Sequence, residues 1–398
     1  MQNHVKNISQ LSFSRVLPLV SGLISTIVIT RHFSLIEYGM FGTAVSALMF
    51  ISIISQLGVH DYLLTRDNYN NEQKSNLLLV YKMAAYIFGI LVTPSLFLFY
   101  AESIIILILI LVVLEGAARR VEELVLFSCQ LDGNYQDYIV KKTVIALANS
   151  TLKIVLILVF DVGLVDFVFI VTITLFLITF LAYRNYFLRY WQSLRRIGLL
   201  FQLRQLFLIK SDLVRFALIS ISHYLYFSSD TFMISLLSSE ENVALYTLAY
   251  YLMSAFLIPT SALWTNFINH QVDHKILKNN YNMIKVVLIS IFCAVMMYLC
   301  AWLYVSYINS QYYEILPIMA VLCIFIIFKY MNTIFELFEI KSGRTNVILK
   351  LRASAASINV VSNCFLILEF GALGAAITTL FLELFIFAYF VKYGEIRN

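Results

Sequence analysis

The sequence has few charged residues. Asp, Glu, Lys and Arg make up 13% of its 398 residues, whereas hydrophobic residues make up 61%. A soluble globular domain carries about a quarter charged residues. With a mean hydropathy of +0.84, the chain holds more apolar surface than a globular core can bury. We therefore expect lipid to solvate most of it, which excludes a soluble enzyme, a nucleic-acid-binding module and a disordered protein.

Sequence motifs for catalysis are also lacking. There is no Walker loop, no His-Glu-x-x-His zinc motif, no Cys-x-x-Cys pair and no nucleophile elbow. We expect no enzyme activity and no cofactor. ATP is then not a direct energy source unless a partner supplies it, and an ion or proton gradient, or removal of substrate on the far side, must drive any net movement. The cysteines lie in or at the ends of apolar segments without ligand-like spacing, and we interpret them as small hydrophobic residues. They are Cys129, Cys293, Cys300, Cys323 and Cys364.

Long apolar segments fill the rest of the chain. A helix that crosses a bilayer needs about 20 mostly apolar residues. The first segment has no small-residue cleavage site after it, so we expect a retained helix rather than a signal peptide. The sequence predicts twelve transmembrane helices, at about 10–30, 38–59, 77–99, 104–127, 138–160, 164–183, 213–237, 243–268, 284–307, 315–338, 347–368 and 371–391.

The positive charges predict the orientation of these helices. Lys and Arg are enriched in cytoplasmic connections. With the N-terminus inside, the outer connections carry only Arg31, whereas the cytoplasmic segments carry nineteen such residues. This asymmetry predicts that both termini are cytoplasmic. The outer connections are short, for example 160–163, 238–242 and 369–371, which excludes a large external catalytic domain.

The longest connection, 184–212, divides the chain into two sets of six spans. We expect an N-terminal lobe over 1–183, a cytoplasmic basic linker over 184–212 and a C-terminal lobe over 213–398. Within the linker, Leu188, Trp191 and Phe201 belong to an apolar pattern with helical spacing among arginines. This pattern indicates either a basic amphipathic helix on the inner membrane surface or a solvated linker.

The two halves share an internal repeat. Three polar positions recur at an offset of 210, and Phe160 matches Phe370 at the same offset. Two repeats of six spans each have the same orientation, so the axis that relates them should follow the membrane normal, as in two-lobed transporters. The recurring positions are Lys142, Asn149 and Lys153 in the first half and Arg352, Asn359 and Asn363 in the second.

Short motifs resemble those of a known family. They lie at the starts of the two halves and of the last span: 36–41 (IEYGMF), 57–59 (LGV), 63–66 (LLTR), 229–234 (SDTFMI), 243–250 (VALYTLAY) and 370–376 (FGALGAA). The chain resembles the polysaccharide-exporting flippases of the Wzx type, which belong to the multidrug/oligosaccharidyl-lipid/polysaccharide (MOP) exporter superfamily.

This resemblance implies an all-α polytopic membrane protein with two six-helix lobes in a V-shaped, MATE-like arrangement around a central cavity. It implies a lipid-linked oligosaccharide substrate, carried on undecaprenyl pyrophosphate and moved from the inner to the outer leaflet of the bacterial cytoplasmic membrane. The expected role is polysaccharide biosynthesis, such as O-antigen and lipopolysaccharide assembly. Expected partners are this glycan, membrane lipids and polysaccharide-assembly proteins such as a polymerase, but no nucleic acid.

Charged groups inside the membrane are costly and mark candidate functional residues. In the fourth span, Glu115 and Arg119 share one helix face with Glu122. This face indicates either a self-paired helix end in the cytosol or a charged cavity wall. In the second case Arg119 or Arg120 would bind pyrophosphate, because the planar guanidinium forms two parallel hydrogen bonds with it.

Two lysines extend this set. Lys153 lies deep in the fifth span near Asn149, where it lines the cavity or extends toward the outer surface. Lys329 shares a polar stripe with Asn332 and Glu336 on the tenth span, and extension toward the inner surface is the alternative there.

The seventh span carries a polar stripe that includes Arg215, His223 and Asp230. A histidine seven residues from an aspartate on one face can form a proton-linked element, because both groups change charge. The alternatives are a packed histidine and an aspartate at the wet outer end. We expect Asp230, His223 and Glu115 to take part in coupling.

Ten of the charged groups in these four spans balance, with five of each sign: Arg119, Arg120, Lys153, Arg215 and Lys329 against Glu115, Glu122, Glu123, Asp230 and Glu336. A cationic cavity therefore requires the acids to pair on their own helices, which would leave Lys153, Arg215 and Lys329 unpaired. A multidrug antiporter of the same superfamily is the first rival, and it would favour an acidic cavity. A membrane-embedded glycan polymerase is the second rival, but it would need a large outer loop.

Overall fold

The computed structural model describes most of the chain. The described residues are 2–56, 59–64, 69–132, 135–197, 229–260, 280–342 and 344–393, with the short pieces 204, 214, 217–218, 221–222 and 224–226. Within them, all regular structure is helical and no strand occurs, which confirms the all-α class.

The chain packs into two compact units that are not continuous in sequence. Unit 1 comprises Met1–His32 and Thr43–Tyr224, and unit 2 comprises Phe33–Gly42 and Leu225–Asn398. Helix α2 therefore begins in unit 2 and continues in unit 1. Much of the predicted linker over 184–212 lies outside the described residues, so the end of the linker at residue 212 stays a prediction.

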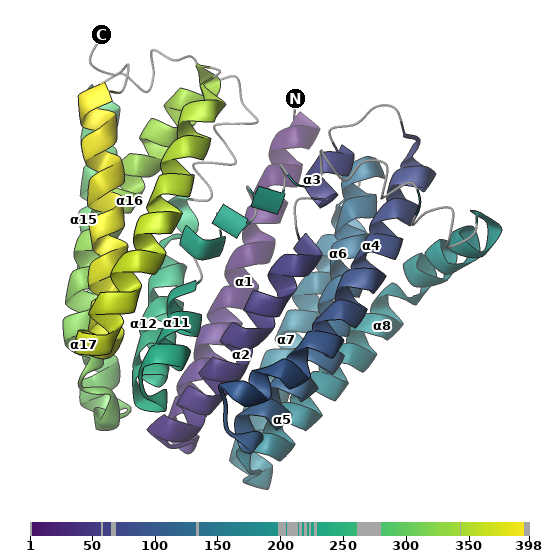
Figure 1. The fold of residues 1–398 in the computed structure, drawn as a ribbon, viewed down its shortest axis with the longest axis horizontal. Coiled ribbons are helices and arrows are strands. Elements are labelled where there is room, and N and C mark those ends of the chain that lie inside the picture. Colours follow the sequence, from purple (N-terminus) through teal and green to yellow (C-terminus); the bar gives the residue numbers. More distant parts are fainter. Residues whose placement is uncertain are drawn as a thin grey trace. The chain divides into compact units, whose positions relative to one another are not determined.

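Unit 1 contains long helices packed side by side (Figure 1). Helix α1 packs along α7, and α4, α6 and α8 pack against one another. The elements are α1 Gln2–His32, α2 Leu35–Gln56, α3 Val59–Leu64, α4 Asn71–Val92, η1 Thr93–Leu98, α5 Glu102–Ile110, η2 Leu111–Glu115, α6 Gly116–Asp132, α7 Gln136–Phe160 and α8 Leu164–Ile197.

Unit 2 packs α16 against both α15 and α17, and α11 against α17. Its elements are α11 Ser229–Leu237, α12 Glu240–Phe256, α15 Asn280–Tyr307, η3 Ser310–Tyr312, α16 Ile315–Lys341 and α17 Thr345–Tyr393. The first residues of α2 complete this unit, because the Tyr38 ring packs edge-on against the Tyr312 ring with centroids 6.4 Å apart.

Helix α17 consists of two membrane-length segments. At Gly371 the backbone has φ 55 and ψ −131, a conformation that favours glycine. Asn363 before this point and Thr379 after it both bond to Asp230, so the chain folds back on itself. The two predicted spans 347–368 and 371–391 correspond to these segments.

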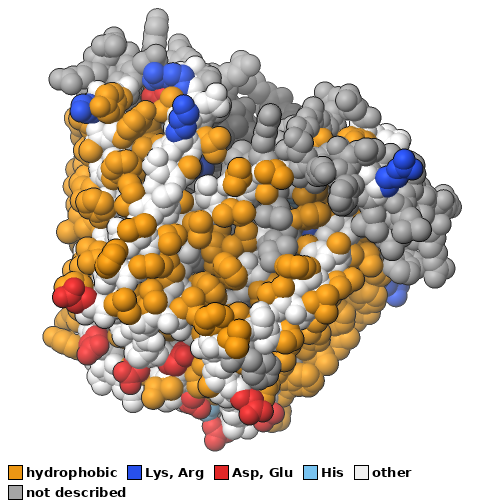
Figure 2. Space-filling view, viewed as in Figure 1, with side chains coloured by type: hydrophobic (Ala, Val, Ile, Leu, Met, Phe, Trp, Pro, Cys, Tyr) orange, Lys and Arg blue, Asp and Glu red, His pale blue; other side chains and the backbone are white. Residues whose placement is uncertain are grey.

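Apolar side chains cover the sides of both units. Leu91, Leu158 and Phe365 each expose 71% of their surface. A soluble protein rarely exposes so many large apolar side chains, whereas lipid accommodates them. In unit 2, Lys and Arg gather at the end where α17 finishes, and Asp and Glu gather at the opposite end (Figure 2).

Seven helices of the described part are long and apolar enough to cross a membrane, and α17 is counted once among them although it holds two predicted spans. The 25 residues of α7 extend about 37 Å at 1.5 Å per residue. This exceeds the ~30 Å hydrocarbon core of a bilayer. The described helices follow the order of the predicted spans, and the chain is a multi-pass helical membrane protein.

Two details differ from the sequence prediction. Helix α8 does not end at residue 183 but continues to Ile197, because no glycine or proline interrupts it. The first part of the predicted linker is thus a continuation of α8, and the rest of the predicted amphipathic helix lies outside the described residues. The predicted fourth span is divided into α5, the π-helical turn η2 and α6.

Candidate functional site

The π-helical turn η2 positions the first pair of charged groups in unit 1. A π turn interrupts the regular α-helical hydrogen bonds, and such turns are frequent at functional sites. Glu115 ends this turn, and its Oε1 accepts hydrogen bonds from Arg119 Nη2 at 2.6 Å and from Arg119 Nε at 3.0 Å. The Arg119 side chain remains 34% exposed. Arg119 is therefore paired on its own helix but still accessible.

Lys153 on α7 lies within electrostatic range of this pair. Its ammonium group interacts electrostatically with Glu115 and Arg119. Within the described residues, however, it forms no hydrogen bond and no ion pair. It lies about 26 Å from the start of α7 and about 11 Å from its end. A half-buried lysine at this depth is a cation without a direct partner, which is costly in a membrane.

Asn149 lies one helical turn from Lys153 on α7. Its Oδ1 atom is buried and has no hydrogen-bond partner in the described part of the chain. A buried amide oxygen without a partner destabilises the protein unless a ligand or water satisfies it. Lys153 and Asn149 therefore offer one cationic donor and one acceptor on neighbouring turns of α7.

Arg120 points to a different set of partners from Arg119. Its Nη1 donates to both carboxylate oxygens of Glu123, at 2.8 and 3.0 Å, and its Nη2 donates to Ser52 Oγ at 3.0 Å. Glu123 also pairs with buried Lys82 of α4 at 2.6 Å. The predicted role of Arg120 in binding pyrophosphate would require breaking this network, because the guanidinium is already buried and paired.

Glu122 interacts electrostatically with Arg119, but it forms its hydrogen bonds with another helix. Its Oε1 lies 2.6 Å from Lys142 Nζ and accepts a hydrogen bond from the Tyr138 hydroxyl at 3.0 Å. Both partners belong to α7. On the helix face predicted for these residues, Arg119 therefore interacts with both acids, while Glu122 hydrogen-bonds to α7.

In unit 2, Asp230 at the start of α11 is enclosed by neutral hydrogen-bond donors. Its Oδ1 accepts from Asn363 Nδ2 at 2.8 Å and from Asn359 Nδ2 at 3.1 Å. Its Oδ2 accepts from the hydroxyls of Tyr246 at 2.7 Å and Thr379 at 2.8 Å. We call these five residues the Asp230 cage.

No lysine or arginine of the described part contacts this carboxylate, which is only 4% exposed. Four neutral donors can hold an ionised carboxylate, yet its charge lacks a counter-ion in a low-dielectric environment. The cage therefore holds a buried acid by neutral hydrogen-bond donors alone.

Lys329 is not an unpaired cation, contrary to the sequence hypothesis. Its Nζ lies 2.9 Å from Glu383 Oε1 and donates to the Tyr226 hydroxyl at 3.3 Å. The other oxygen of Glu383 accepts from Asn332 Nδ2 at 2.6 Å, and Tyr226 donates to Oε1. The lysine is neutralised by an acid on another helix, so it is not available as a free cation for an anionic substrate.

Other predicted acids also pair across helices. Glu336 pairs with Arg352 of α17 at 2.8 Å. Arg215 and His223 lie outside the described residues, so their predicted roles stay predictions. Lys82 and Glu383 are not among the residues predicted for the site. Both could have been found by the criterion used for the others, namely a charge inside an apolar span.

The two units therefore differ in the charge that they hold within the membrane. Unit 1 contains the cation Lys153 without a direct partner among the described residues, and unit 2 contains the acid Asp230 without a cation among them. Together with the helical architecture, these features define a multi-pass membrane protein that holds charged side chains within its membrane-spanning helices.

Comparison with solved structures identifies the fold. The chain has the fold of MATE transporters of the MOP superfamily. A crystal structure of MATE in complex with MaL6 is 14% identical, covers 98% of this chain and 95% of its own, and gives a TM-score of 0.56. An outward-facing multidrug resistance MATE family transporter is 14% identical, with coverages of 98% and 95% and a TM-score of 0.54.

An inward-facing multidrug resistance MATE family transporter matches with 14% identity, coverages of 97% and 94%, and a TM-score of 0.56. A MOP superfamily transporter from Pyrococcus furiosus, described as having a reverse polarity of the binding pocket that suggests a different function, is 15% identical. It covers 98% of this chain and 96% of its own, with a TM-score of 0.54. No family model and no curated protein matches the sequence.

Proposed function

We propose that this protein is a flippase for lipid-linked oligosaccharides. It moves an oligosaccharide repeat unit on undecaprenyl pyrophosphate from the inner to the outer leaflet of the bacterial cytoplasmic membrane. Both termini are on the cytoplasmic side, as the distribution of Lys and Arg predicts. This assignment is in line with the sequence resemblance to Wzx-type flippases.

The observation that carries the proposal is the half-buried ammonium group of Lys153, which has no hydrogen bond and no ion pair within the described residues. An intramembrane lysine costs about 3 kcal/mol or more. A pyrophosphate group offsets this cost, because its negative charges interact strongly with a cation where the dielectric constant is low. Arg119, which is 34% exposed, can add a bidentate contact.

Alternating access is the transport mechanism that the fold likeness supports. Solved structures with this fold include one described as outward-facing and one described as inward-facing. In such a cycle Lys153 holds the pyrophosphate in the protein interior while the polyprenyl tail stays in lipid. The Pyrococcus furiosus transporter, with its reverse pocket polarity, supports the view that pocket charge differs between proteins of this fold.

The Asp230 cage supplies the coupling in this proposal. A proton or a monovalent cation binds to Asp230 and neutralises the carboxylate in one state of the transport cycle, and it dissociates in the other state. Movement of the substrate is then linked to an ion gradient. Glu115 and His223 are further coupling candidates.

The test combines export with analysis of lipid-linked intermediates in the source bacterium. We expect Lys153→Glu to lower export at least about tenfold, because a charge-assisted contact contributes about 1.5–3 kcal/mol. Complete repeat units should then accumulate on the inner leaflet. Lys153→Arg keeps the charge and should retain export, as should Lys350→Glu at an exposed position of α17. Unchanged export in Lys153→Glu, at equal membrane abundance, would rule out the proposed site.

A multidrug or cation antiporter is the alternative function, and Asp230 is the observation that favours it. A buried acid without a cation suits exchange of a cationic drug for a proton or sodium ion. Cells that express the protein should then expel ethidium, and Asp230→Asn should abolish this efflux. Ethidium efflux together with normal lipid-linked intermediates in a deletion strain would establish the antiporter instead of the flippase.

A further inference from the structure

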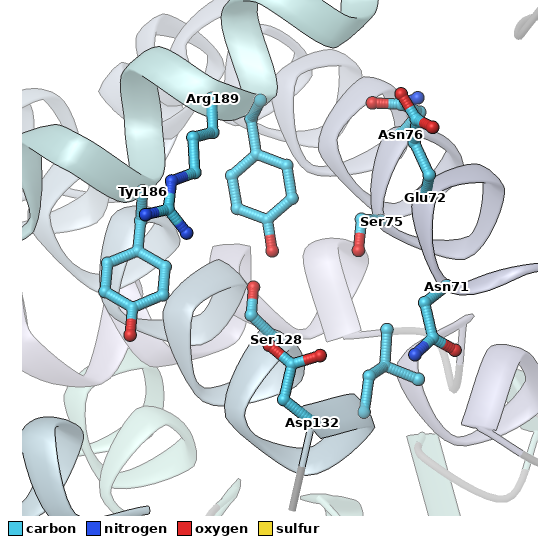
Figure 3. A pocket seen from close by; sticks show the side chains of 10 residues that line it. Asn71, Glu72, Ser75, Asn76, Ser128, Asp132, Tyr186 and Arg189 are labelled. Atoms are coloured by element: carbon cyan, nitrogen blue, oxygen red, sulfur yellow. The ribbon is translucent and has the colours of Figure 1, made fainter. Parts of the chain in front are cut away.

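Unit 1 contains a polar pocket that the transport proposal does not use. It lies where the start of α4, the end of α6 and the second half of α8 meet, and its volume is about 250 Å³. Figure 3 shows Arg189 and Tyr186 on one side of it, Ser128 and Asp132 on a second, and Ser75 and Asn71 on a third. The positive-inside distribution places these helix ends on the cytoplasmic side.

The three helices form the pocket without needing a ligand. Helices α4, α6 and α8 pack against one another. Their contact includes a buried apolar cluster with Leu78, Phe127 and Tyr190 among its members. The Tyr190 hydroxyl donates to the Leu124 carbonyl at 3.2 Å and shares a hydrogen bond with Ser75. The pocket is thus pre-organised, which lowers the entropic cost of binding a ligand.

The lining groups indicate a neutral ligand that is rich in hydroxyl groups. Asp132 supplies acceptors, Arg189 supplies donors, and Asn71 supplies both. The acids Asp132 and Glu72 disfavour an anion, and Arg189 disfavours a cation. Within the described residues, neither Arg189 nor Asp132 forms an ion pair, so both can bond to a ligand. The half-buried Tyr186 also lines the pocket, and Lys141 Nζ lies 5.8 Å from the centre of its ring.

The size of the pocket limits the ligand further. Sites for drug-sized molecules have volumes of about 300–1,000 Å³. At about 250 Å³, this pocket is too small for a whole lipid-linked oligosaccharide. A single sugar ring satisfies the size, the neutral charge and the mixed donors and acceptors.

We propose that this pocket binds one sugar residue at the cytoplasmic surface of unit 1. This proposal rests on the proposed function only for the source of the sugar. That source is the glycan of the lipid-linked substrate, before the substrate enters the protein. In that role Asp132 and Arg189 select the sugar by the positions of its hydroxyl groups. Sugar choice is then made on the inner face, apart from the pyrophosphate contact at Lys153.

The test measures binding of simple sugars to the full-length protein in detergent. The probes are the methyl glycosides of glucose, galactose, mannose and N-acetylglucosamine, observed by saturation-transfer difference NMR. We expect at least one of them to bind. Asp132→Asn and Arg189→Gln should each weaken it about tenfold or more, because each removes a charge-assisted hydrogen bond. Arg184→Gln, at an exposed position of the same helix outside the pocket, should leave binding unchanged.

Three results would overturn the proposal. They are no binding of any of the four glycosides, binding that survives both substitutions, and binding of inorganic phosphate that depends on Arg189 alone, which would make this an anion site. The two proposals can fail separately. If export needs Lys153 but no glycoside binds, only the proposal of a sugar-binding pocket is rejected. If a glycoside binds but export does not need Lys153, only the proposal of a pyrophosphate site at Lys153 is rejected.

Discussion

Arg352 and Glu336 form an ion pair of 2.8 Å in unit 2, and the pair between Lys142 and Glu122, at 2.6 Å, is its counterpart in unit 1. The two cations lie 210 positions apart in the sequence. The two acids lie 214 positions apart, so the second acid is displaced by about one helical turn from the position that matches the first. In each unit the pair joins the predicted fourth helix of the repeat to the fifth. This shared contact supports an internal duplication of six helices.

The duplicated positions have diverged where the charge matters most. At the offset of 210, Asn363 of the Asp230 cage corresponds to Lys153, and Asp230 itself corresponds to Val20 on α1. Helix α1 packs along α7 as α11 packs along α17. In unit 2 these positions hold an acid and an amide donor, whereas in unit 1 the matching positions hold an apolar residue and a cation.

The first prediction concerns the Asp230 cage. Asp230→Ala removes the acceptor for four hydrogen bonds, each worth about 0.6 kcal/mol on average between membrane helices. We expect a loss of roughly 2–3 kcal/mol of stability from these bonds. Asp230→Asn keeps an acceptor for Asn359 and Asn363, and the hydroxyls of Tyr246 and Thr379 can rotate to accept its NH₂ group. Thermal unfolding followed by fluorescence-detected size-exclusion chromatography should separate the two variants. Equal destabilisation would contradict the cage geometry.

The second prediction concerns the buried pair of Lys329 and Glu383. Glu383→Gln leaves the ammonium group buried without its counter-charge, which typically costs about 3–5 kcal/mol. Removing both charges in Lys329→Met/Glu383→Gln should recover most of this loss, because no isolated charge remains. Glu369→Gln, at an exposed position of α17, is the matched control and should have little effect. A double variant as unstable as Glu383→Gln would show that the two side chains are not coupled.

The third prediction concerns Gly371. Its positive φ costs a residue with a side chain about 1–3 kcal/mol. A Cβ atom there would also collide with the side chain of Asn242, whose Oδ1 accepts a hydrogen bond from the Ala372 amide at 3.0 Å. Gly371→Ala should therefore lower the melting temperature. Gly163→Ala is the control, because a Cβ atom at that position meets no atom within 4 Å. Identical melting of both variants would exclude a strained turn in α17.

Much of the helical architecture could be predicted from the sequence because long apolar segments in a membrane have few alternatives to the helix. Contacts within one helix were predictable in the same way. The spacing of Glu115 and Arg119 places them one turn apart, and the structure pairs them. The recurrence of Asn359 and Asn363 was also visible, but not their shared partner Asp230.

Contacts between helices could not be predicted. Lys329 and Glu383 lie 54 residues apart, and their pairing depends on how α16 and α17 rotate against each other. Likewise, the pairing of Glu122 with Lys142 depends on how α6 and α7 rotate against each other. Apolar periodicity fixes neither rotation. A cationic cavity required the acids to pair on their own helices. Glu336 instead pairs with Arg352 of α17, and Glu123 pairs with Lys82 of α4 as well as with Arg120 of its own helix.

The short segment Phe33–Gly42 limits how the protein can be dissected. It belongs to unit 2 although it precedes most of unit 1, and a Cβ atom on Gly39 would collide with the Glu240 carbonyl group. A fragment that starts after α8 would lack this segment and expose the surface that Tyr38 covers on Tyr312. Separate expression of the C-terminal half therefore calls for a grafted peptide spanning these ten positions, or for co-expression with the N-terminal fragment.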